Sequence, residues 1–312
     1  PNCGFEGARG DQCDNCSKLL DPEDLIDMVC RICHNPPVIK DTEHFFMKLS
    51  AFEDRLLEWV RQQDHFKPNV KNFTIGYLEG GLHDRAITRD LSWGVPVPVT
   101  DLDGNQVDGH DGKVLYVWFD APIGYPSITA AYTEEWEKWW KNPDQVTLYQ
   151  FMGKDNVRFH TVIFPSCLIG TGDNWTKLHH ISTTEYLQYE GGKFSKSRGV
   201  GVFGDKAAET GIASSVWRYY LLMNRPETSD SQFAWGDFIA KNNNELLANL
   251  GNFVNRVLTF ISKKYDGVLP DAPKALLEAP NGKYAALVSD VNALLVTYCE
   301  GMEQAKLRSG LQ

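Results

Sequence analysis

Five of the seven cysteines lie within the first 33 residues of the chain. Cys13-Asp-Asn-Cys16 and Cys30-Arg-Ile-Cys33 form two C-x-x-C pairs, and Cys3 precedes both of them. Two thiolates on one tight turn can bind the same Zn²⁺, because tetrahedral zinc accepts sulfur ligands at this spacing. The cysteine spacing therefore predicts a small module, over about residues 1–40, that is held together by structural zinc.

A haem group would account for only part of this cysteine pattern. Cys30 to His34 fits C-x-x-C-H, the attachment pattern of c-type haem, but haem leaves the neighbouring cysteine pair unexplained and requires export. The first residues show neither a basic segment nor an apolar segment of a signal peptide. Buried thiols without a metal are the plain alternative. We favour zinc in a reducing cytosol and expect a cytoplasmic protein.

A basic loop offers a second kind of chemistry. Lys193-Phe-Ser-Lys196-Ser197-Arg198 carries three cations and two hydroxyls within six residues. Such a loop can wrap a triphosphate and stabilise the charge on departing pyrophosphate. A basic loop is more often only a solvated surface. This one comes shortly after a β-rich run at residues 178–182, which we predict to be a strand.

Two further unusual segments accompany other predicted strands. Residues 118–125 overlap the end of the predicted strand 114–119, and residues 153–160 follow the predicted strand 148–152. Ligands of an open parallel sheet bind at the carboxyl ends of its strands. We therefore expect these segments and the basic loop to meet at one site.

The order of elements predicts an α/β protein. Apolar positions at three- and four-residue steps indicate helix over residues 44–79, and short β-rich runs alternate with helical segments from 114 to 182, including a predicted strand at 161–168. This alternation favours a parallel sheet. After residue 213 strand signals vanish, and amphipathic patterns at 233–261 and 283–308 favour a helical bundle.

Composition excludes several classes of protein. The 42% apolar and 23% charged content is ordinary for a globular chain, which rules out collagen, coiled coil and general disorder. The net charge of −10 argues against a general binder of polyanions. No apolar run approaches the roughly 20 residues that span a bilayer, so we expect no membrane partner.

These motifs together resemble a known family. Lys193-Phe-Ser-Lys196-Ser197 resembles the Lys-Met-Ser-Lys-Ser loop of class I aminoacyl-tRNA synthetases, and residues 118–125 with 153–160 resemble the amino-acid pocket of the methionyl-tRNA synthetase family. The likeness runs the length of the chain. It implies the second half of a Rossmann-type catalytic domain, with a zinc-knuckle insertion before it and an anticodon-binding helical bundle after it.

The resemblance implies a role for individual residues. The methionine pocket would be lined by Trp118, Ala121, Pro122, Tyr125, Phe159 and His160. ATP would be bound by Gly153, Lys154, Asp155, Lys193 and Lys196, and the catalytic loop residues would be Lys193, Ser195, Lys196 and Ser197. The anticodon would be read by Asn252 and Arg256, which are four residues apart on one helix face. Zinc would be held by Cys3, Cys13 and Cys16 at one site and by Cys30 and Cys33 at a second.

The implied domains follow from the same comparison. They are the zinc-knuckle part of the insertion (1–40), the rest of the insertion (41–88), the second catalytic half with the loop (89–200), a linker that contacts the tRNA stem (201–235) and an anticodon-binding bundle (236–312). The implied reaction activates methionine with ATP and Mg²⁺ and transfers it to tRNA(Met). Protein partners in a synthetase complex are a further implication.

The chain departs from the family pattern in two respects. Phe194 replaces the loop methionine, which keeps the position apolar. None of the eight histidines belongs to a His-x-Gly-His motif, which normally binds ATP phosphates at a helix N-terminus. We expect the chain to begin within the insertion and to be inactive by itself. The alternative is a non-catalytic, zinc-containing module for tRNA binding or assembly.

Overall fold

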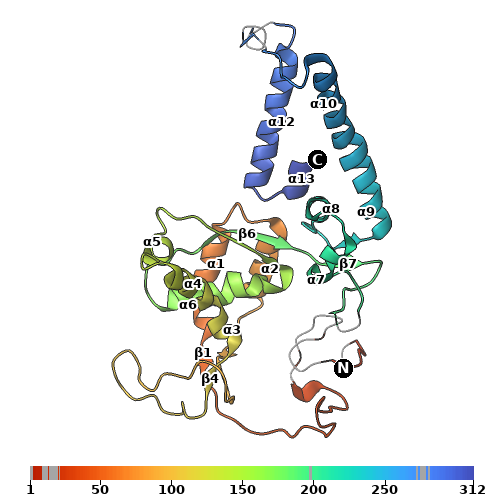
Figure 1. Cartoon of the computed structure of the whole chain (residues 1–312). Coiled ribbons are helices and arrows are strands. Elements are labelled where there is room, and N and C mark those ends of the chain that lie inside the picture. Colours follow the sequence, from red (N-terminus) through yellow and green to blue (C-terminus); the bar gives the residue numbers. More distant parts are fainter. Residues whose placement is uncertain are drawn as a thin grey trace. The chain divides into compact units, whose positions relative to one another are not determined.

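The computed structural model describes residues 3–8, 13, 20, 22–196, 199–271, 273–274, 279 and 282–312. The chain forms two compact units (Figure 1). The first unit is Pro1–Met47 with Ala86–Tyr116, and the second is Lys48–Arg85 with Val117–Gln312. No helix in the described part of the chain is long and apolar enough to cross a membrane.

The first unit contains little regular structure. Its elements are the 3₁₀ turn η1 (Pro22–Asp24), β1 (Phe46–Met47), β3 (Thr88–Arg89) and β4 (Val114–Leu115), and β2 (Arg85–Ala86) lies at the unit boundary. Strands β3 and β4 pair antiparallel, with Thr88 opposite Leu115. The buried Thr88 hydroxyl accepts the N–H of Phe45 at 3.1 Å. Buried polar groups of this kind need a partner, so this contact helps to hold the segment at Phe45 beside β3.

The second unit alternates helices and strands. It begins with η2 (Leu49–Phe52), α1 (Glu53–Arg61), α2 (Pro68–Glu79), α3 (Val117–Asp120), η3 (Ala121–Ile123), α4 (Gly124–Tyr132) and α5 (Glu137–Trp140). Then come β5 (Leu148–Gly153), η4 (Lys154–Asn156), the π-helix η5 (Phe159–Ile163), α6 (Phe164–Gly170), β6 (Leu178–Thr184) and β7 (Leu187–Tyr189). The last elements are α7 (Gly204–Ala207), η7 (Ala208–Thr210), α8 (Ser214–Met223), β8 (Ser231–Phe233), α9 (Trp235–Lys241), the π-helix η8 (Asn242–Gly251), α10 (Asn252–Tyr265), α12 (Ala285–Glu303) and α13 (Leu307–Leu311).

Two parallel strand pairs organise this unit. β5 pairs with β6, from Leu148 opposite Leu178 to Gly153 opposite Thr184. β7 pairs with β8 in the same sense, with Tyr189 opposite Phe233. Parallel neighbours require a crossover connection, and η4, η5 and α6 supply it between β5 and β6. The expected α/β class with parallel pairing is confirmed.

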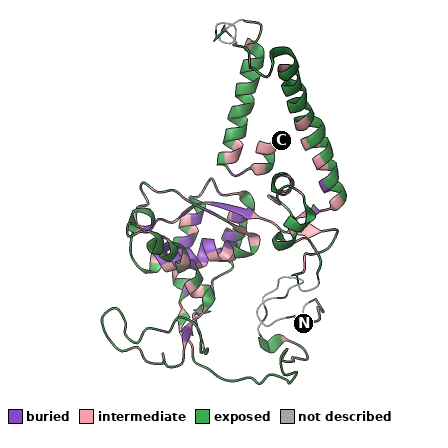
Figure 2. Cartoon of the chain, viewed as in Figure 1, coloured by how far each residue is buried: buried purple, intermediate pink, exposed green. Residues whose placement is uncertain are grey.

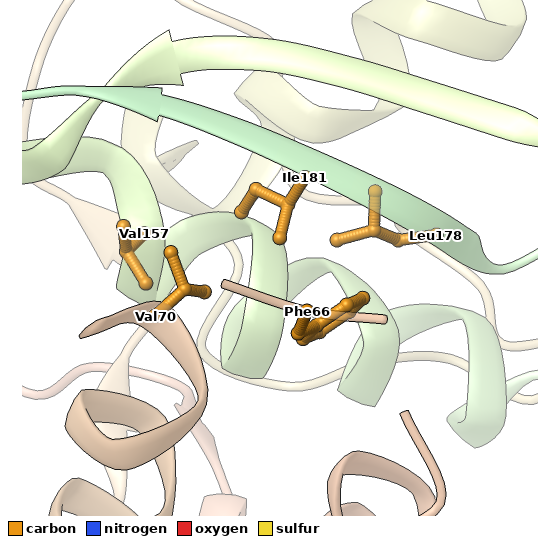
Figure 3. Close-up of a cluster of buried hydrophobic side chains, with 5 residues drawn as sticks. All are labelled: Phe66, Val70, Val157, Leu178 and Ile181. Carbon is orange, nitrogen blue, oxygen red and sulfur yellow. The ribbon is translucent and has the colours of Figure 1, made fainter. Parts of the chain in front are cut away.

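A buried apolar cluster joins these elements (Figure 3). It consists of Phe66, Val70, Val157, Leu178 and Ile181, with Trp59 and Met152 packed against it. Beside it, the Thr74 hydroxyl donates to the Thr161 hydroxyl at 3.1 Å. Helices α1 and α2 thus pack through this core against the strand pair and the helical turns that follow β5.

Three strand predictions need correction. Only Val114–Leu115 of the predicted strand 114–119 is a strand, its partner is antiparallel, and the chain is helical from Val117. Residues 161–168 are helical in η5 and α6. A short strand, β8, occurs after residue 213, where no strand was expected. Apolar runs that are buried as helices cannot be told from strands by periodicity alone.

The C-terminal part is helical. α9, η8 and α10 follow one another without interruption from Trp235 to Tyr265. No residue of α10 or α12 is buried (Figure 2). The chain after α12 contacts the segment that follows α8. The Arg225 guanidinium donates to the Ala305 carbonyl at 3.1 Å, and Glu227 accepts the N–H of Leu307 at 2.9 Å.

We expect Ile181→Ala to lower the free energy of unfolding by about 3 kcal/mol, because Ile181 is fully buried and the cluster around it can collapse only in part. Ile128→Ala, at an exposed position, is the matched control and should change it by less than about 0.5 kcal/mol. Urea denaturation followed by tryptophan fluorescence measures both. Equal losses in the two variants would contradict the described core.

Candidate active site

Four of the predicted pocket rings form two contacting pairs, each of which includes a residue of η5. Trp118 of α3 meets Phe159 of η5 edge to face, with ring centroids 5.0 Å apart. Tyr125 of α4 lies 5.6 Å from the ring of His160. Trp118 and Tyr125 are 40% and 41% exposed, whereas His160 is buried. Each pair therefore joins one exposed ring to a ring of η5, where Phe159 is half-buried and His160 is buried.

Pro122 and Ala121 lie in η3, between the two exposed rings. Pro122 is buried and Ala121 is exposed. A proline fits here because its fixed φ suits a helical start and its missing N–H is not needed there. The segment that we predicted as the end of a strand is thus a helical turn that spaces Trp118 and Tyr125.

His160 and Tyr125 share a hydrogen bond that fixes their protons. The His160 Nδ1 donates to the Asn156 carbonyl at 2.8 Å, so Nε2 is the acceptor for the Tyr125 hydroxyl, also at 2.8 Å. This tautomer is assigned from the hydrogen-bond network. Burial lowers the pKa of His160, although its bond to Asn156 works in the opposite direction. The pair is neutral near pH 7 and adds no unpaired charge to the pocket.

The segment after β5 carries the residues predicted for ATP. A Cβ at Gly153 would lie 2.6 Å from Asp155 Oδ1, so only glycine lets this carboxylate approach the strand end. The Lys154 ammonium lies 2.8 Å from Glu185 and 2.7 Å from Asp230. It also lies 4.4 Å from the centre of the Tyr186 ring. Lys154 is thus enclosed by groups of the protein itself.

The basic loop is closed by a small backbone ladder. Ser195 and Val200 exchange N–H to carbonyl bonds of 2.9 and 3.0 Å, and the Gly199 N–H bonds to the Lys196 carbonyl. Lys193 and Lys196 are exposed. Ser197 and Arg198 lie outside the described residues. The ladder presents the loop as a compact turn rather than a loose strand.

Phe194 anchors this loop. Its ring lies 5.1 Å from Tyr189 and 6.0 Å from Phe203. Tyr189 in turn stacks on Phe233, and its hydroxyl accepts the Trp235 indole N–H at 2.9 Å. The apolar residue at the second position of the motif therefore connects the loop to a buried aromatic cluster.

The residues predicted to read an anticodon lie elsewhere in the unit. Asn252 begins α10 and Arg256 follows one turn later, so both lie on one face, and both are exposed. The π-helix that precedes α10 is an unusual element. π-turns are rare in proteins overall, and those that occur are often at functional sites. Within this π-helix, Glu245 accepts the Tyr219 hydroxyl at 2.6 Å.

The cysteine module is described in part. Cys3 Sγ and Cys13 Sγ are 3.6 Å apart, close to the roughly 3.8 Å that two sulfurs reach on one tetrahedral Zn²⁺. The backbone N–H groups of Cys33 and Ile32 bond to the sulfur of Cys30 and lower the pKa of this thiol. A lower pKa favours the thiolate form that zinc requires. Cys16 lies outside the described residues. Among the residues with described positions, no group of three or more potential metal ligands occurs. The Cys3–Cys13 distance is compatible with two ligands of one zinc ion, but a complete ligand set is not among the described residues.

Sequence reasoning missed two carboxylates of this site, Glu185 and Asp230. Glu185 directly follows β6, so its place at a strand end was a usable signal. Asp230 had no such signal, because its contact with Lys154 spans 76 residues.

Comparison with known proteins identifies the class. The family of class I tRNA synthetases (M) matches residues 1–258, and the chain belongs to this family. Over its whole length the chain is 55% identical to a Schizosaccharomyces pombe protein named probable cytoplasmic methionine–tRNA ligase, and 48% identical to the human cytoplasmic methionine–tRNA ligase. It covers 39% and 33% of these relatives. The chain thus spans about two fifths or less of their length.

A solved structure supports the architecture. Mycobacterium tuberculosis methionyl-tRNA synthetase, bound by methionyl-adenylate, matches 91% of this chain and 52% of its own, with a TM-score of 0.71 and 26% identity. The Rossmann-type class I fold expected from the sequence is therefore confirmed. The alternative of a non-catalytic module receives no support from these relatives.

We expect Tyr125→Phe to raise the pKa of His160, because the hydroxyl that bonds Nε2 stabilises the neutral ring. In the unchanged protein the pKa of His160 lies below its ordinary 6.5. The contribution of the neutral ring to the free energy of unfolding is therefore present above about pH 6.5, and it is lost as the pH falls through the lower pKa of the folded state. NMR titration of the ring protons measures this pKa. Tyr132→Phe, at an exposed tyrosine, is the control and should leave it unchanged. A lower pKa in Tyr125→Phe would contradict the described hydrogen bond.

We expect Gly201→Ala to loosen the basic loop. Gly201 has φ +122°, and a Cβ there would collide with the Phe194 ring. Strain of about 1–3 kcal/mol corresponds to about 5- to 150-fold faster hydrogen exchange at the Ser195 and Val200 amides. Gly204→Ala, where a Cβ meets nothing within 4 Å, is the control and should leave their exchange unchanged. Unaltered exchange in Gly201→Ala would show that Phe194 does not hold the loop.

Proposed function

We propose that the natural protein is a methionine–tRNA ligase, which activates methionine with ATP and transfers it to tRNA(Met). One observation carries the proposal: the rings matched to the family's pocket form two contacting pairs, Trp118 with Phe159 and Tyr125 with His160, and both pairs include a residue of η5. The 48–55% identity to proteins named methionine–tRNA ligase supports it. The same names support a cytoplasmic location.

The pocket chemistry suits a thioether. Aromatic walls make favourable contacts with polarizable sulfur, and the neutral His160 avoids a charge that methionine could not neutralise. The proton of the Tyr125 hydroxyl is directed at His160. Recognition of the sulfur in this arrangement therefore relies on ring contacts with Trp118, Phe159 and Tyr125 rather than on a hydrogen bond from either polar group. Pro122 and Ala121 would complete the lining.

The nucleotide would lie at the end of β5. Asp155 would accept hydroxyl hydrogens of the adenosine ribose beside Gly153, where the absence of a Cβ leaves room. Lys193 and Lys196 would stabilise the charge that develops on the α-phosphorus and on pyrophosphate as the methionine carboxylate attacks in line. Ser195 and Ser197 would add hydroxyl donors from the same loop. Mg²⁺ would accompany ATP and neutralise part of its charge.

The remaining parts would serve tRNA binding and structure. Residues 1–40 would form the zinc-knuckle part of an insertion that continues to residue 88, with Cys3, Cys13 and Cys16 at one zinc ion and Cys30 and Cys33 at another. The second catalytic half (89–200) would lead through a stem-contact linker (201–235) to an anticodon-binding bundle (236–312). There Asn252 and Arg256 would read the anticodon. Protein partners of a synthetase complex belong to the same proposal.

Amino-acid-dependent exchange between ATP and pyrophosphate tests the function. We expect the natural full-length protein to catalyse exchange with methionine, and with no other of the twenty amino acids at a comparable rate. The 312 residues by themselves should give none, because they hold no His-x-Gly-His motif. Exchange that depends on a different amino acid, or none with any, in a folded full-length protein would contradict the proposal.

A further inference from the structure

Lys154 joins three elements that are distant in sequence. It directly follows β5, while Glu185 directly follows β6 and Asp230 directly precedes β8. The Lys154 ammonium is 2.8 Å from the Glu185 carboxylate and 2.7 Å from that of Asp230. The Glu185 side chain is the most shielded at 17% exposure, whereas those of Lys154 and Asp230 are 34% and 36% exposed. Shielded pairs are screened less by water than those on an open surface.

Both carboxylates also hold the backbone or side chains around them. Asp230 accepts the Tyr186 N–H at 2.9 Å, and Glu185 accepts the amide group of Asn69 at 3.3 Å. The Tyr186 ring lies against the Lys154 ammonium. The cluster, defined here as Lys154, Glu185, Tyr186 and Asp230, therefore fixes the connection between β6 and β7 and the start of β8.

This connection carries the basic loop. β7 pairs with β8 immediately after Tyr186 and Asp230, from Leu187 opposite Ser231 to Tyr189 opposite Phe233. The loop begins four residues after β7, and its Phe194 packs on Tyr189. The position of β7, which begins directly after Tyr186 of the cluster, therefore sets the position of the loop relative to the end of β5.

We infer that Lys154 is a positioning residue, which holds the β7–β8 pair, and through it the Lys193–Lys196 loop, in register with the Gly153–Asp155 segment. This inference rests on the proposed function, since the loop and that segment are the proposed ATP-binding parts. It replaces direct ATP binding as the role of Lys154.

The charge balance supports positioning over phosphate binding. Partial burial opposes the charge of Lys154, but its bonds to Asp230 and Glu185 outweigh this and raise its pKa. The bond from Lys154 is the main cause that lowers the pKa of Asp230. One ammonium between two carboxylates carries a net charge of −1. Such a group repels a triphosphate and does not attract it.

Lys154→Met in the natural full-length protein tests the inference, since it removes the positive charge and keeps a long, unbranched side chain. We expect kcat for methionine-dependent pyrophosphate exchange to fall about 10- to 100-fold, because a misplacement near 1 Å costs about that much. KM for methionine should change less than about twofold, since Tyr125 and His160 are held by hydrogen bonds to each other and to the Asn156 carbonyl. Lys141→Met is the matched control. Lys141 has a similar exposure of 31%, pairs with Asp173 at 2.8 Å and lies 4.9 Å from the Trp175 ring, so its loss should leave kcat unchanged.

A double-mutant cycle separates positioning from direct contact with ATP. In the Glu185→Gln, Asp230→Asn background the partners of Lys154 are gone, so Lys154→Met should cost less than about threefold in kcat. A cost equal to that in the unchanged background, or any cost above threefold, would show that Lys154 acts on the substrate itself and would overturn the inference.

Hydrogen exchange supplies a readout that does not depend on catalysis. In Lys154→Met we expect about tenfold faster exchange, or more, at the Tyr186 and Ser231 amides, which are bonded in the cluster and beside it. The Ile181 amide in β6 is the internal reference. Unchanged exchange at Tyr186 and Ser231 would overturn the inference. The proposed function alone would be contradicted by a different result: no methionine-dependent ATP–pyrophosphate exchange in the unchanged full-length protein, together with faster amide hydrogen exchange in Lys154→Met.

Discussion

The parallel pairing of β5 with β6 is the constraint from which the site follows. Register pairs Gly153 with Thr184, so Lys154 and Glu185 leave the sheet side by side. Their ion pair is a consequence of where the ladder ends and does not need a separate folding step. A parallel pair also requires a crossover, and the crossover here contains the turn that carries Asp155 and the helix that carries His160. Binding residues and their support therefore come from one stretch of chain.

The core beneath the strands makes this arrangement rigid. Val157 and Thr161 lie on either side of Phe159 and His160 in sequence, and both are buried. Val157 packs in the cluster with Ile181, while Thr161 receives a hydrogen bond from Thr74 of α2. Functional side chains are most precise when the residues next to them are locked by packing. Here the residues that flank the pocket rings are the ones that the core immobilises.

The sequence predicted the two strands of the β5–β6 pair but not the elements between them. The short runs at 148–152 and 178–182 are both strands, as predicted. The run at 161–168 is also short and rich in apolar residues but is buried as a helix, so pattern alone could not distinguish it. The family resemblance placed Tyr125 and His160 in one pocket but did not predict the hydrogen bond between them. The Lys154–Asp230 contact was not predictable, because it depends on the pairing of β7 with β8, two three-residue strands that leave almost no pattern.

The charged side chains of the proposed site differ from one part of it to the next in how they are paired and in how far they are exposed. The pocket end is neutral, since His160 and Tyr125 satisfy each other. The end of β5 holds a cation that is already neutralised, because Lys154 follows a strand and cannot move to meet a phosphate. Lys193 and Lys196 stand on an exposed turn that one aromatic anchor attaches to the core. Cations that must follow phosphate as its geometry changes during reaction belong on such a loop, while a cation at a fixed strand end is better used to hold that loop in place.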